Sequence, residues 1–368
     1  MRVVVVGATG NTGTAVLRRL ARSPEVEAVS GVARRVPGPQ AGAPYEGVDW
    51  HAVDVGADDA VARLTDVFAG AGAVIHLAWQ IQPSHQRRQI RRTNVTGTAH
   101  VAEAVVRASV PALVVASSIG AYAPGPKDTE VGEDWPVTGV PGSTYSRDKA
   151  DVEALLDDVE LEHPQLRVVR IRPGLIFQRS AAAEIARYFI GPFAPLPLLR
   201  LGWLPLVPYH PRLRVQALHA DDAAEAYVRA ALGDAHGPFN IAADPVLDGE
   251  RIAARFAGRT VPVPPAVLRL AASVTWHARL QPTEPGWIPL AAHVPLMSTA
   301  RAEKELGWAP RMDALGALTE LVDGMARGTG TPAPPMRPRG LPDLRVPGTA
   351  TRTEQPARVS ADEPGRQR

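Results

Sequence analysis

The chain has 368 residues, 45% of them hydrophobic and 21% charged, which is enough for one large globular domain or two moderate ones. The net charge is +2, and the stretch after Ala326 contributes +4 of it, so the remaining −2 does not favour nucleic-acid binding. Cysteine is absent, which excludes disulfides, thiolate metal sites and cysteine nucleophiles, and we expect no metal site.

The N-terminus shows no targeting signal, because only the four valines of Val3–Val6 precede a glycine-rich turn. No run of about 20 apolar residues lacks charge and proline, so we expect no membrane span. The nearest candidate, Phe189–Pro208, contains several prolines and Arg200. We therefore expect a cytoplasmic protein with neither a membrane nor a nucleic acid as its partner.

Short β-branched runs alternate with helical stretches through the first half of the chain. In chain order we predict strands at 3–6, 28–33, 48–53, 73–77, 112–117 and 166–171, and helices at 12–22, 58–68, 86–109 and 143–161. Apolar strands that alternate with helices are typical of a parallel sheet covered on both faces. The predicted fold is α/β, with a Rossmann-type doubly wound parallel sheet in residues 1–172.

The pattern becomes less regular after Pro173, where proline-rich segments interrupt short helices and strands. We predict a smaller C-terminal substrate lobe in residues 173–327 that is partly interleaved with the Rossmann domain. From Gly328 onward the chain is rich in proline, glycine, threonine and arginine, with little apolar periodicity. This composition predicts a disordered tail in residues 328–368.

A glycine-rich turn, Gly7-Ala8-Thr9-Gly10-Asn11-Thr12-Gly13, separates the first predicted strand from the first helix. Glycines permit a tight turn, and the helix N-terminus favours the negative charge of a pyrophosphate. Because strand and helix flank the turn in the right order, we predict that it binds a dinucleotide. The predicted contacts are Gly7, Thr9, Gly10, Asn11, Thr12 and Gly13.

The second predicted strand ends in Ala33-Arg34-Arg35, where an NAD-specific site usually has an acid for the ribose hydroxyls. A guanidinium can pair with a 2′-phosphate, so we predict NADP as the cofactor, with NAD as the alternative. A solvated basic loop is the other interpretation of Arg34 and Arg35. Asp54 follows the third strand and can accept a hydrogen bond from the adenine amino group or cap the next helix.

Tyr145 and Lys149 are four residues apart in a predicted helix, so they lie on one face. A cation beside a phenol lowers the pKa of the phenol, which lets Tyr145 exchange a proton with the substrate during hydride transfer. Lys149 can also hold the nicotinamide ribose. Ser118 ends a predicted strand, where parallel sheets form ligand crevices, and its hydroxyl can orient the substrate oxygen. We predict these three residues to be catalytic.

Several motifs recur in order, and with them the sequence resembles the extended short-chain dehydrogenase/reductases, the NAD-dependent epimerase/dehydratase family. The matching segments are Gly7–Gly13, His76–Ala78, Asn94–Thr98, Ser117-Ser118 with Tyr122, Arg172–Gly174, His219–Asp222 and Leu306–Pro310. The resemblance implies an oxidoreductase in which Ser118, Tyr145 and Lys149 act as described. It also implies a homodimer through the helices that contain Asn94 and Tyr145. Further implied cofactor contacts are Val55, Leu77, Ala78, Trp79, Asn94, Lys149 and Pro173.

Two departures from the family pattern bear on the reaction. The dehydratases of the family carry an Asp-Glu pair where this chain has Ile119-Gly120, so the acid and base for water elimination are missing. Nucleotide-sugar epimerases commonly have an arginine where this chain has Val215, and Arg214 is one residue out of register.

Three residues near the C-terminal motifs have structural interpretations. We interpret His219 as a hydrogen-bonded structural histidine, Asp222 as a helix cap and Trp308 as a packing residue.

The loop at 79–85 follows the strand predicted to line the cofactor, so Gln80, Ser84 and His85 are candidate substrate contacts, although a plain surface loop is an equal alternative. Ser117 and Tyr122 are further candidates. The leading hypothesis is an NADP-dependent reductase or dehydrogenase acting on a carbonyl or secondary alcohol of a small molecule. The alternatives are a sugar or nucleotide-sugar epimerase and a non-catalytic dinucleotide-sensing binding protein.

Overall fold

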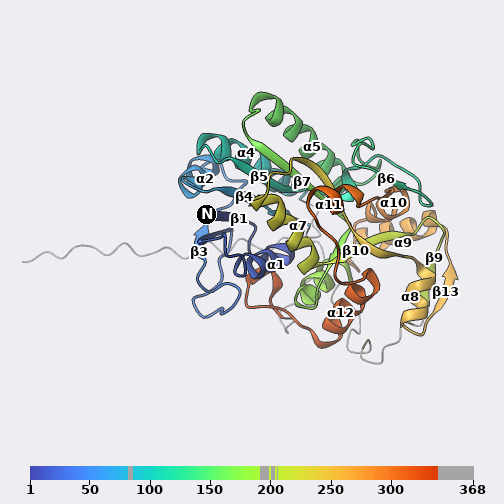
Figure 1. The fold of residues 1–368 in the computed structure, drawn as a ribbon. Helices are drawn as coiled ribbons and strands as arrows, with labels where there is room; N and C mark the ends of the chain where they lie inside the picture. The colour runs from blue at the N-terminus through green and yellow to red at the C-terminus, as the bar shows by residue number, and fades with distance from the viewer. Residues whose placement is uncertain (82–85, 191–198, 200–203, 205, 339–368) are drawn as a thin grey trace, which may run out of the picture.

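The computed structural model describes residues 1–81, 86–190, 199, 204 and 206–338, and its centre is a seven-stranded sheet (Figure 1). The strand order is β11-β7-β5-β4-β1-β2-β3, and every neighbouring pair is parallel. The strands are β1 (Arg2–Val6), β2 (Ala28–Ala33), β3 (Asp49–Ala52), β4 (Ala73–His76), β5 (Ala112–Ala116), β7 (Arg167–Pro173) and β11 (Gly237–Ile241). The predicted doubly wound α/β fold is confirmed.

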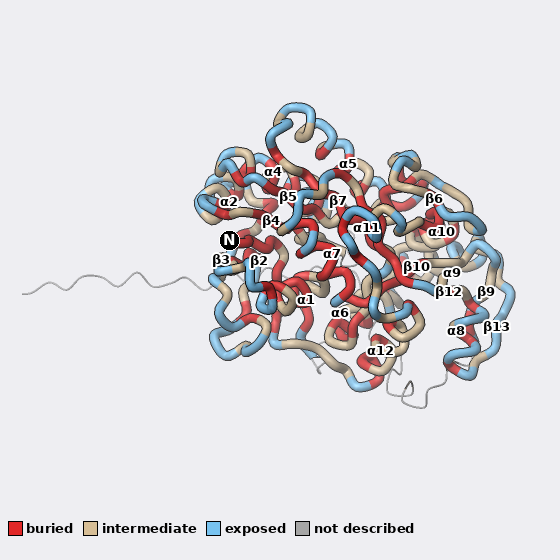
Figure 2. Tube along the Cα trace, in the orientation of Figure 1, coloured by how far each residue is buried: buried red, intermediate tan, exposed pale blue. Residues whose placement is uncertain are grey.

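Helices cover both faces of this sheet because alternate side chains of each strand point to opposite faces. Val3 and Val5 of β1 pack with α1 (Asn11–Leu20) and α7 (Ala220–Leu232). Val4 and Val6 pack on the other face with α2 (Ala60–Phe68), α4 (Gly97–Arg107) and α5 (Thr144–Glu162). Figure 2 shows the buried residues concentrated along the central strands and the inner sides of these helices.

The smaller lobe is built mainly from residues after β7. It contains a three-stranded sheet, β12-β10-β8, and two strand pairs, β13 with β9 and β14 with β6. These strands are β6 (Glu130–Val131), β8 (Leu175–Phe177), β9 (Leu206–Tyr209), β10 (Val215–His219), β12 (Ala243–Leu247), β13 (Arg259–Pro262) and β14 (Leu296–Met297). Because α7 and β11 belong to the Rossmann domain, the two parts of the chain are interleaved.

The helices of this lobe are α6 (Ala182–Ile185), α8 (Gly249–Arg255), α9 (Pro265–His277), α10 (Trp287–His293), α11 (Ala300–Glu305) and α12 (Ala314–Arg327). Short turns of other helix types include η2 (Ile119–Ala121), η3 (Arg179–Ala181), η4 (Ala186–Ile190) and η6 (Pro334–Met336). Within the described ranges, no helix is long and apolar enough to cross a membrane.

The helix predicted at 86–109 is confirmed over residues 87–107, with a π-helical turn in its middle that the sequence did not predict. It consists of α3 (Arg87–Arg91), a π-helical turn η1 (Arg92–Thr96) and α4. The π turn carries Asn94, which is 1% exposed and bonds the backbone of Gln80 through its amide. Such turns insert one extra residue and commonly occur at functional sites.

Contacts around the start of α7 confirm the structural interpretations of His219 and Trp308 and correct that of Asp222. His219, not Asp222, caps α7, because its Nδ1 accepts a hydrogen bond from the Asp221 N–H at 3.2 Å. Asp222 Oδ2 instead accepts from the Met312 N–H at 3.1 Å. Trp308 is a packing residue, 1% exposed, whose indole donates to the Asp222 carbonyl at 2.7 Å.

Residues 329–338, which we call the C-terminal strap, are ordered, so the prediction of disorder from residue 328 is wrong for this segment. Gly328 ends α12 with a φ of 66°, and the strap then returns to the Rossmann domain. There Tyr45 donates a hydrogen bond to Thr331 at 2.9 Å, and Ala333 and Met336 are fully buried. Two apolar anchors in a proline-rich segment create no periodicity, so the sequence pattern gave no sign of this packing.

Deleting residues 329–368 is expected to lower Tm by roughly 5 °C. Burying a methionine contributes about 1.5–3 kcal/mol, and each kcal/mol corresponds to roughly 2–4 °C in a domain of this size. Differential scanning calorimetry measures the effect. The matched control deletes only 339–368, which keeps every strap contact, and equal Tm values for the two shortened proteins would contradict the packing described here.

Candidate active site

A groove lies at the carboxyl ends of β1, β2, β3 and β4. The strand order of the sheet reverses between β1 and β4. Open α/β sheets bind ligands at this switch point. The residues that line the groove are Val6, Gly7, Thr9, Gly10, Val32–Arg35, Val53–Val55, Leu77–Gln80, Thr93, Glu184 and Pro335. Ten of the residues predicted to contact the cofactor thus lie together: Gly7, Thr9, Gly10, Arg34, Arg35, Asp54, Val55, Leu77, Ala78 and Trp79.

The glycine turn forms a cradle that fits a pyrophosphate. Gly7 has a φ of 88°, and a Cβ on it would lie 2.5 Å from the Ala78 nitrogen. A Cβ on Gly13 would lie 2.3 Å from the Gly7 carbonyl oxygen, so only glycine lets α1 approach β1 this closely. No side chain of the described residues caps the start of α1 at Gly10. The positive end of the helix dipole is therefore open toward an anionic ligand.

The groove is lined by two exposed arginines, Arg34 and Arg35, directly after β2. Asp54 lies beside them after β3, and its Oδ1 accepts a hydrogen bond from the Gly56 N–H at 3.0 Å. Asp54 therefore closes the turn before α2 with one oxygen while it still lines the groove. The acidic residues along the groove are Asp54 and Glu184, and neither occupies the position after β2 that NAD-specific sites use.

Six predicted cofactor residues do not line the groove: Asn11, Thr12, Gly13, Asn94, Lys149 and Pro173. The side chain of Asn11 is used to join α1 to the lobe. Its Nδ2 donates to the Ile176 carbonyl at 3.0 Å, and its Oδ1 accepts from Gln178 at 2.7 Å. These bonds use the side chain and not the backbone N–H of Asn11, so a cofactor contact through that N–H stays a prediction.

Glu184 and Pro335 line the groove but were missed from the sequence, because no motif marks either one. Burial raises the pKa of Glu184 to about 7, while the charge of Arg187 and a hydrogen bond with Tyr188 act in the opposite direction. Pro335 belongs to the strap, whose position depends on Arg187. That guanidinium donates to the Pro335 carbonyl at 2.8 Å and to the Arg337 carbonyl at 2.9 Å.

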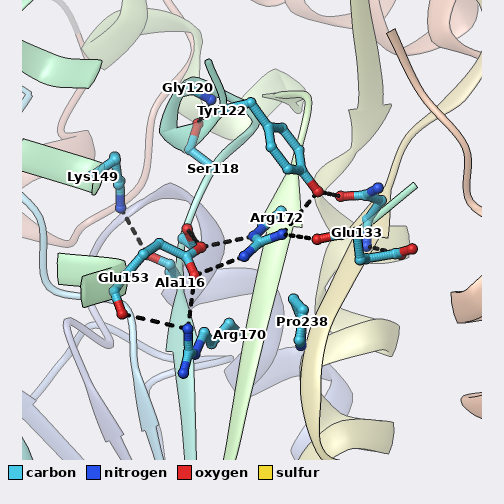
Figure 3. A network of polar contacts seen from close by, with 12 residues as sticks. Ala116, Ser118, Gly120, Tyr122, Glu133, Lys149, Glu153, Arg170, Arg172 and Pro238 are labelled. Carbon is cyan, nitrogen blue, oxygen red and sulfur yellow. Dashed lines mark hydrogen bonds and ion pairs between the residues drawn. The ribbon is translucent and has the colours of Figure 1, made fainter. Parts of the chain in front are cut away.

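Ser118, Tyr145 and Lys149 lie close together beside the groove, where Tyr145 and Lys149 contact the groove residue Trp79. Ser118 is the extended residue after β5, and its Oγ accepts a hydrogen bond from the Gly120 N–H at 3.0 Å (Figure 3). Tyr145 lies on the first turn of α5, close to Ser118. Its ring packs edge-on against Trp79, with 5.9 Å between ring centres. Trp79 lines the groove, so Tyr145 lies next to the groove.

Lys149 is buried and directed toward β5. Its Nζ donates to the Ala116 carbonyl at 2.7 Å (Figure 3). The same atom lies 3.4 Å from the centre of the Trp79 ring and 6.0 Å from the centre of the Tyr145 ring. Burial lowers the pKa of Lys149 to about 7, although the charges of Glu153 and Asp148 favour its cation.

The pKa of Tyr145 moves opposite to the expectation from its spacing to Lys149. Burial raises it to about 12, and only the hydrogen bond with Ser118 acts in the other direction. The physical reason is that the Lys149 ammonium points at the Ala116 carbonyl and the Trp79 ring. In this geometry Tyr145 is a neutral phenol and therefore a proton donor.

Ser117 and Tyr122 do not face a ligand site, which corrects their predicted role as substrate contacts. Ser117 is 3% exposed and donates its hydroxyl proton to Glu153. Tyr122 is fully buried; its hydroxyl donates to Asn240 at 2.7 Å and accepts from Arg172 at 2.9 Å (Figure 3). Successive side chains of an extended segment point to opposite sides. Ser118 therefore faces Tyr145, whereas its neighbour Ser117 faces Glu153.

A second pocket lies on the other side of Tyr145 and shares Gln80 with the groove. Asn94 positions this shared residue, because its Oδ1 accepts from the Gln80 N–H at 2.7 Å and its Nδ2 donates to the Gln80 carbonyl at 3.0 Å. The remaining lining residues are Ile81, Arg87, Ile90, Thr144, Asp148, Tyr188, Pro282, Glu284 and Trp287. Of the loop residues predicted to contact substrate, Gln80 lies here, whereas Ser84 and His85 lie outside the described residues.

The structure thus brings together a parallel sheet, a glycine turn at its switch point and the Ser118–Tyr145–Lys149 set beside the groove. The chain belongs to the NAD dependent epimerase/dehydratase family, whose model matches residues 3–242. This confirms the resemblance seen in the sequence motifs.

Known proteins of this type show limited sequence identity to the chain. An uncharacterised protein of Mycobacterium tuberculosis is 27% identical over 245 residues, which are 66% of this chain and 61% of the relative. L-arabinose 1-dehydrogenase (NAD(P)+) of Haloferax volcanii is 28% identical over 204 residues, which are 51% of this chain and 74% of that enzyme. The crystal structure of Thermus thermophilus UDP-glucose 4-epimerase in complex with NAD shares the fold, with a TM-score of 0.63 and 21% identity over 89% of this chain and 99% of that one.

Replacing Gly7 with alanine is expected to weaken NADPH and NADH binding at least tenfold, because the added Cβ would overlap the Ala78 backbone. Gly47→Ala is the matched control, since Gly47 also has a positive φ of 74° but open space around it. Both variants carry the left-handed backbone cost of about 1–2 kcal/mol, and only the first closes the cradle. Fluorescence titration measures the affinity; equal affinities in the two variants would argue against a nucleotide at Gly7.

Proposed function

We propose that the protein is an NADP-dependent reductase or dehydrogenase that acts on a carbonyl or secondary alcohol of a small molecule, with Tyr145 as the acid/base. The observation that carries this proposal is the position of Tyr145 between two cavities. Trp79, which packs on the Tyr145 ring, lines the nucleotide groove, and Tyr145 itself lines the second pocket. A substrate in the second pocket therefore meets a cofactor in the groove beside the phenol.

The protonation state of Tyr145 favours the reductive direction. The nicotinamide, when bound, supplies or accepts the hydride. Ser118 orients the substrate oxygen, and the neutral Tyr145 phenol donates its proton to that oxygen as negative charge develops there. Because burial keeps the phenol protonated at neutral pH, Tyr145 enters the reaction as an acid, as carbonyl reduction requires.

Replacing Tyr145 with phenylalanine is expected to lower kcat at least 100-fold, the usual contribution of a positioned acid, while the Kd for NADPH stays within about twofold. Steady-state assays and fluorescence titration measure the two quantities. Tyr209→Phe, at a half-buried tyrosine of β9 outside both cavities, serves as the control. Undiminished function in Y145F would contradict the enzyme assignment and favour a dinucleotide sensor.

The choice of NADP over NAD rests on Arg34 and Arg35. Both lie at the mouth of the groove after β2, where a 2′-phosphate can form charge-assisted hydrogen bonds with a guanidinium. The name of the Haloferax volcanii relative gives NAD(P)+, and the Thermus thermophilus structure contains NAD, so both cofactors occur among similar proteins.

Replacing Arg34 with alanine is expected to weaken NADPH binding about tenfold, the equivalent of about 1.4 kcal/mol, and to leave NADH binding nearly unchanged. Titration of purified protein with each nucleotide measures both affinities. Arg22→Ala, at an exposed arginine after α1, controls for the loss of one positive charge. A wild-type preference for NADH, or an equal effect of R34A on both nucleotides, would overturn the NADP assignment.

A further inference from the structure

The outer side of α9 carries large apolar side chains that stay exposed in the folded chain. Val267, Leu270 and Val274 are 53%, 66% and 60% exposed. They are three and four residues apart, a spacing that places them in one stripe along a helix. The opposite side of α9 carries Trp276, which is 7% exposed, and the helix packs against α10. Packing within the chain therefore uses the inner side of α9 and leaves the outer stripe in solvent.

The strand pair β9 and β13 presents a second apolar surface at the same end of the lobe (Figure 1). Leu206 is 67% exposed, and the exposed Val261 is the register partner of Pro208, two residues further along β9. Val207, between these two residues of β9, is buried where the strand packs against α8. Because successive side chains of a strand alternate, Leu206 and Val261 lie on the face away from α8. β13 ends three residues before α9 begins.

The same stretch of chain is strongly basic. Residues 251–283 include five arginines and no acidic residue, so they carry +5 in a chain whose net charge is +2. Arg251 is paired with Asp248 at 2.5 Å, but Arg259, Arg269 and Arg279 have no carboxylate partner within the described ranges. All three are exposed. The exposed apolar residues therefore stand among cations whose charge the protein does not balance.

This combination of charge and apolar surface indicates the kind of partner. A second copy is disfavoured, because a symmetric contact places the same patch on both sides and would bring the unpaired arginines of both copies together. The surface of a membrane with anionic lipids is complementary, since lipid phosphates attract the arginines and the headgroup region accepts apolar side chains. At 13 residues, α9 is shorter than the roughly 20 residues that a spanning helix needs, so such a contact is a surface contact.

We propose that the outer stripe of α9 and the exposed face of β9 and β13 dock the protein on a membrane surface that contains anionic lipids. In the docked protein α9 lies in the plane of the membrane, with Leu270 and Val274 among the headgroups and Arg259 and Arg279 against lipid phosphates. The expectation of no membrane partner rested on the lack of a spanning segment, and this proposal replaces it with a contact at the surface. It does not depend on the proposed function.

The docking helix is directly joined to one wall of the second pocket. Gln281, just after α9, donates to the Ala272 carbonyl at 3.2 Å and to the Thr275 hydroxyl at 3.1 Å, both within the helix. Pro282 and Glu284 follow and line the pocket. Docking through α9 would therefore also hold this wall of the pocket relative to the membrane.

Sedimentation of the full-length protein with lipid vesicles tests the proposal. One set of vesicles is pure phosphatidylcholine, and the other contains about 30% phosphatidylglycerol. We expect the partition coefficient to be at least about tenfold higher for the anionic vesicles and to fall when NaCl is raised from about 0.05 M to about 0.5 M, because salt screens the arginines. No binding to the anionic vesicles would overturn the proposal, and equal binding to both sets would overturn the assignment to anionic lipids.

Substitutions locate the contact on the protein. L270E/V274E and R259E/R279E are each expected to lower the partition coefficient at least about tenfold, while Tm and the Kd for NADPH stay unchanged because these side chains are exposed. L161E is the matched control, since Leu161 is 81% exposed on α5. Undiminished vesicle binding in L270E/V274E, or an equal loss in L161E, would overturn the assignment to α9.

Two further measurements separate a lipid surface from the other possible occupants. Light scattering detects self-association, and an oligomer that L270E/V274E dissociates would show that the face joins copies of the chain, against the proposal. Polyglutamate offers negative charge without lipid. Binding to polyglutamate as tight as to the anionic vesicles would favour an acidic protein partner and overturn the lipid assignment.

Discussion

The carboxylate of Glu153 is 1% exposed, lies on α5 one turn beyond Lys149, and joins three elements of the protein. It accepts hydrogen bonds from Arg172 at 2.8 and 2.9 Å, from Arg170 at 3.2 Å and from Ser117 (Figure 3). Burial alone would raise the pKa of Glu153, but the hydrogen bonds and charge of Arg172 hold it below its ordinary value. A buried charge is tolerated only with such partners, so α5, β5 and β7 have one mutual position.

That constraint extends to the Ser118–Tyr145–Lys149 set and to the edge strand β11. With α5 held on the sheet, Tyr145 lies beside Ser118, and Lys149 reaches the Ala116 carbonyl at the end of β5. Arg172 extends the network through Tyr122 to Asn240 on β11. The same buried contacts hold α5 against the sheet. Tyr145 on this helix is therefore buried, and burial keeps its side chain a neutral phenol.

The sequence predicted those parts of the site that depend on local spacing. The positions of the glycine turn and of Ser118 follow from where two predicted strands end. The pairing of Tyr145 with Lys149 follows from their spacing of four residues in a helix. Spacing says nothing about burial, however, so the direction of the Tyr145 pKa was wrong. Glu184, Pro335, Asp148 and Glu284 could not be assigned, because each acquires its place only when segments distant in the sequence pack together. Ser117 and Tyr122 belong to a recognisable motif, yet their neighbours in space make them structural.

The strap has a consequence for how the protein is made. The groove is lined by Gly7 and by Pro335, which lie far apart in the sequence. During synthesis the N-terminal strands can begin to fold first, but the groove lacks a wall until the strap has left the ribosome. A nucleotide that binds only the native state stabilises that state. A ligand that fills the groove would therefore also stabilise the packing of the strap, because Pro335 is one of the residues it would contact.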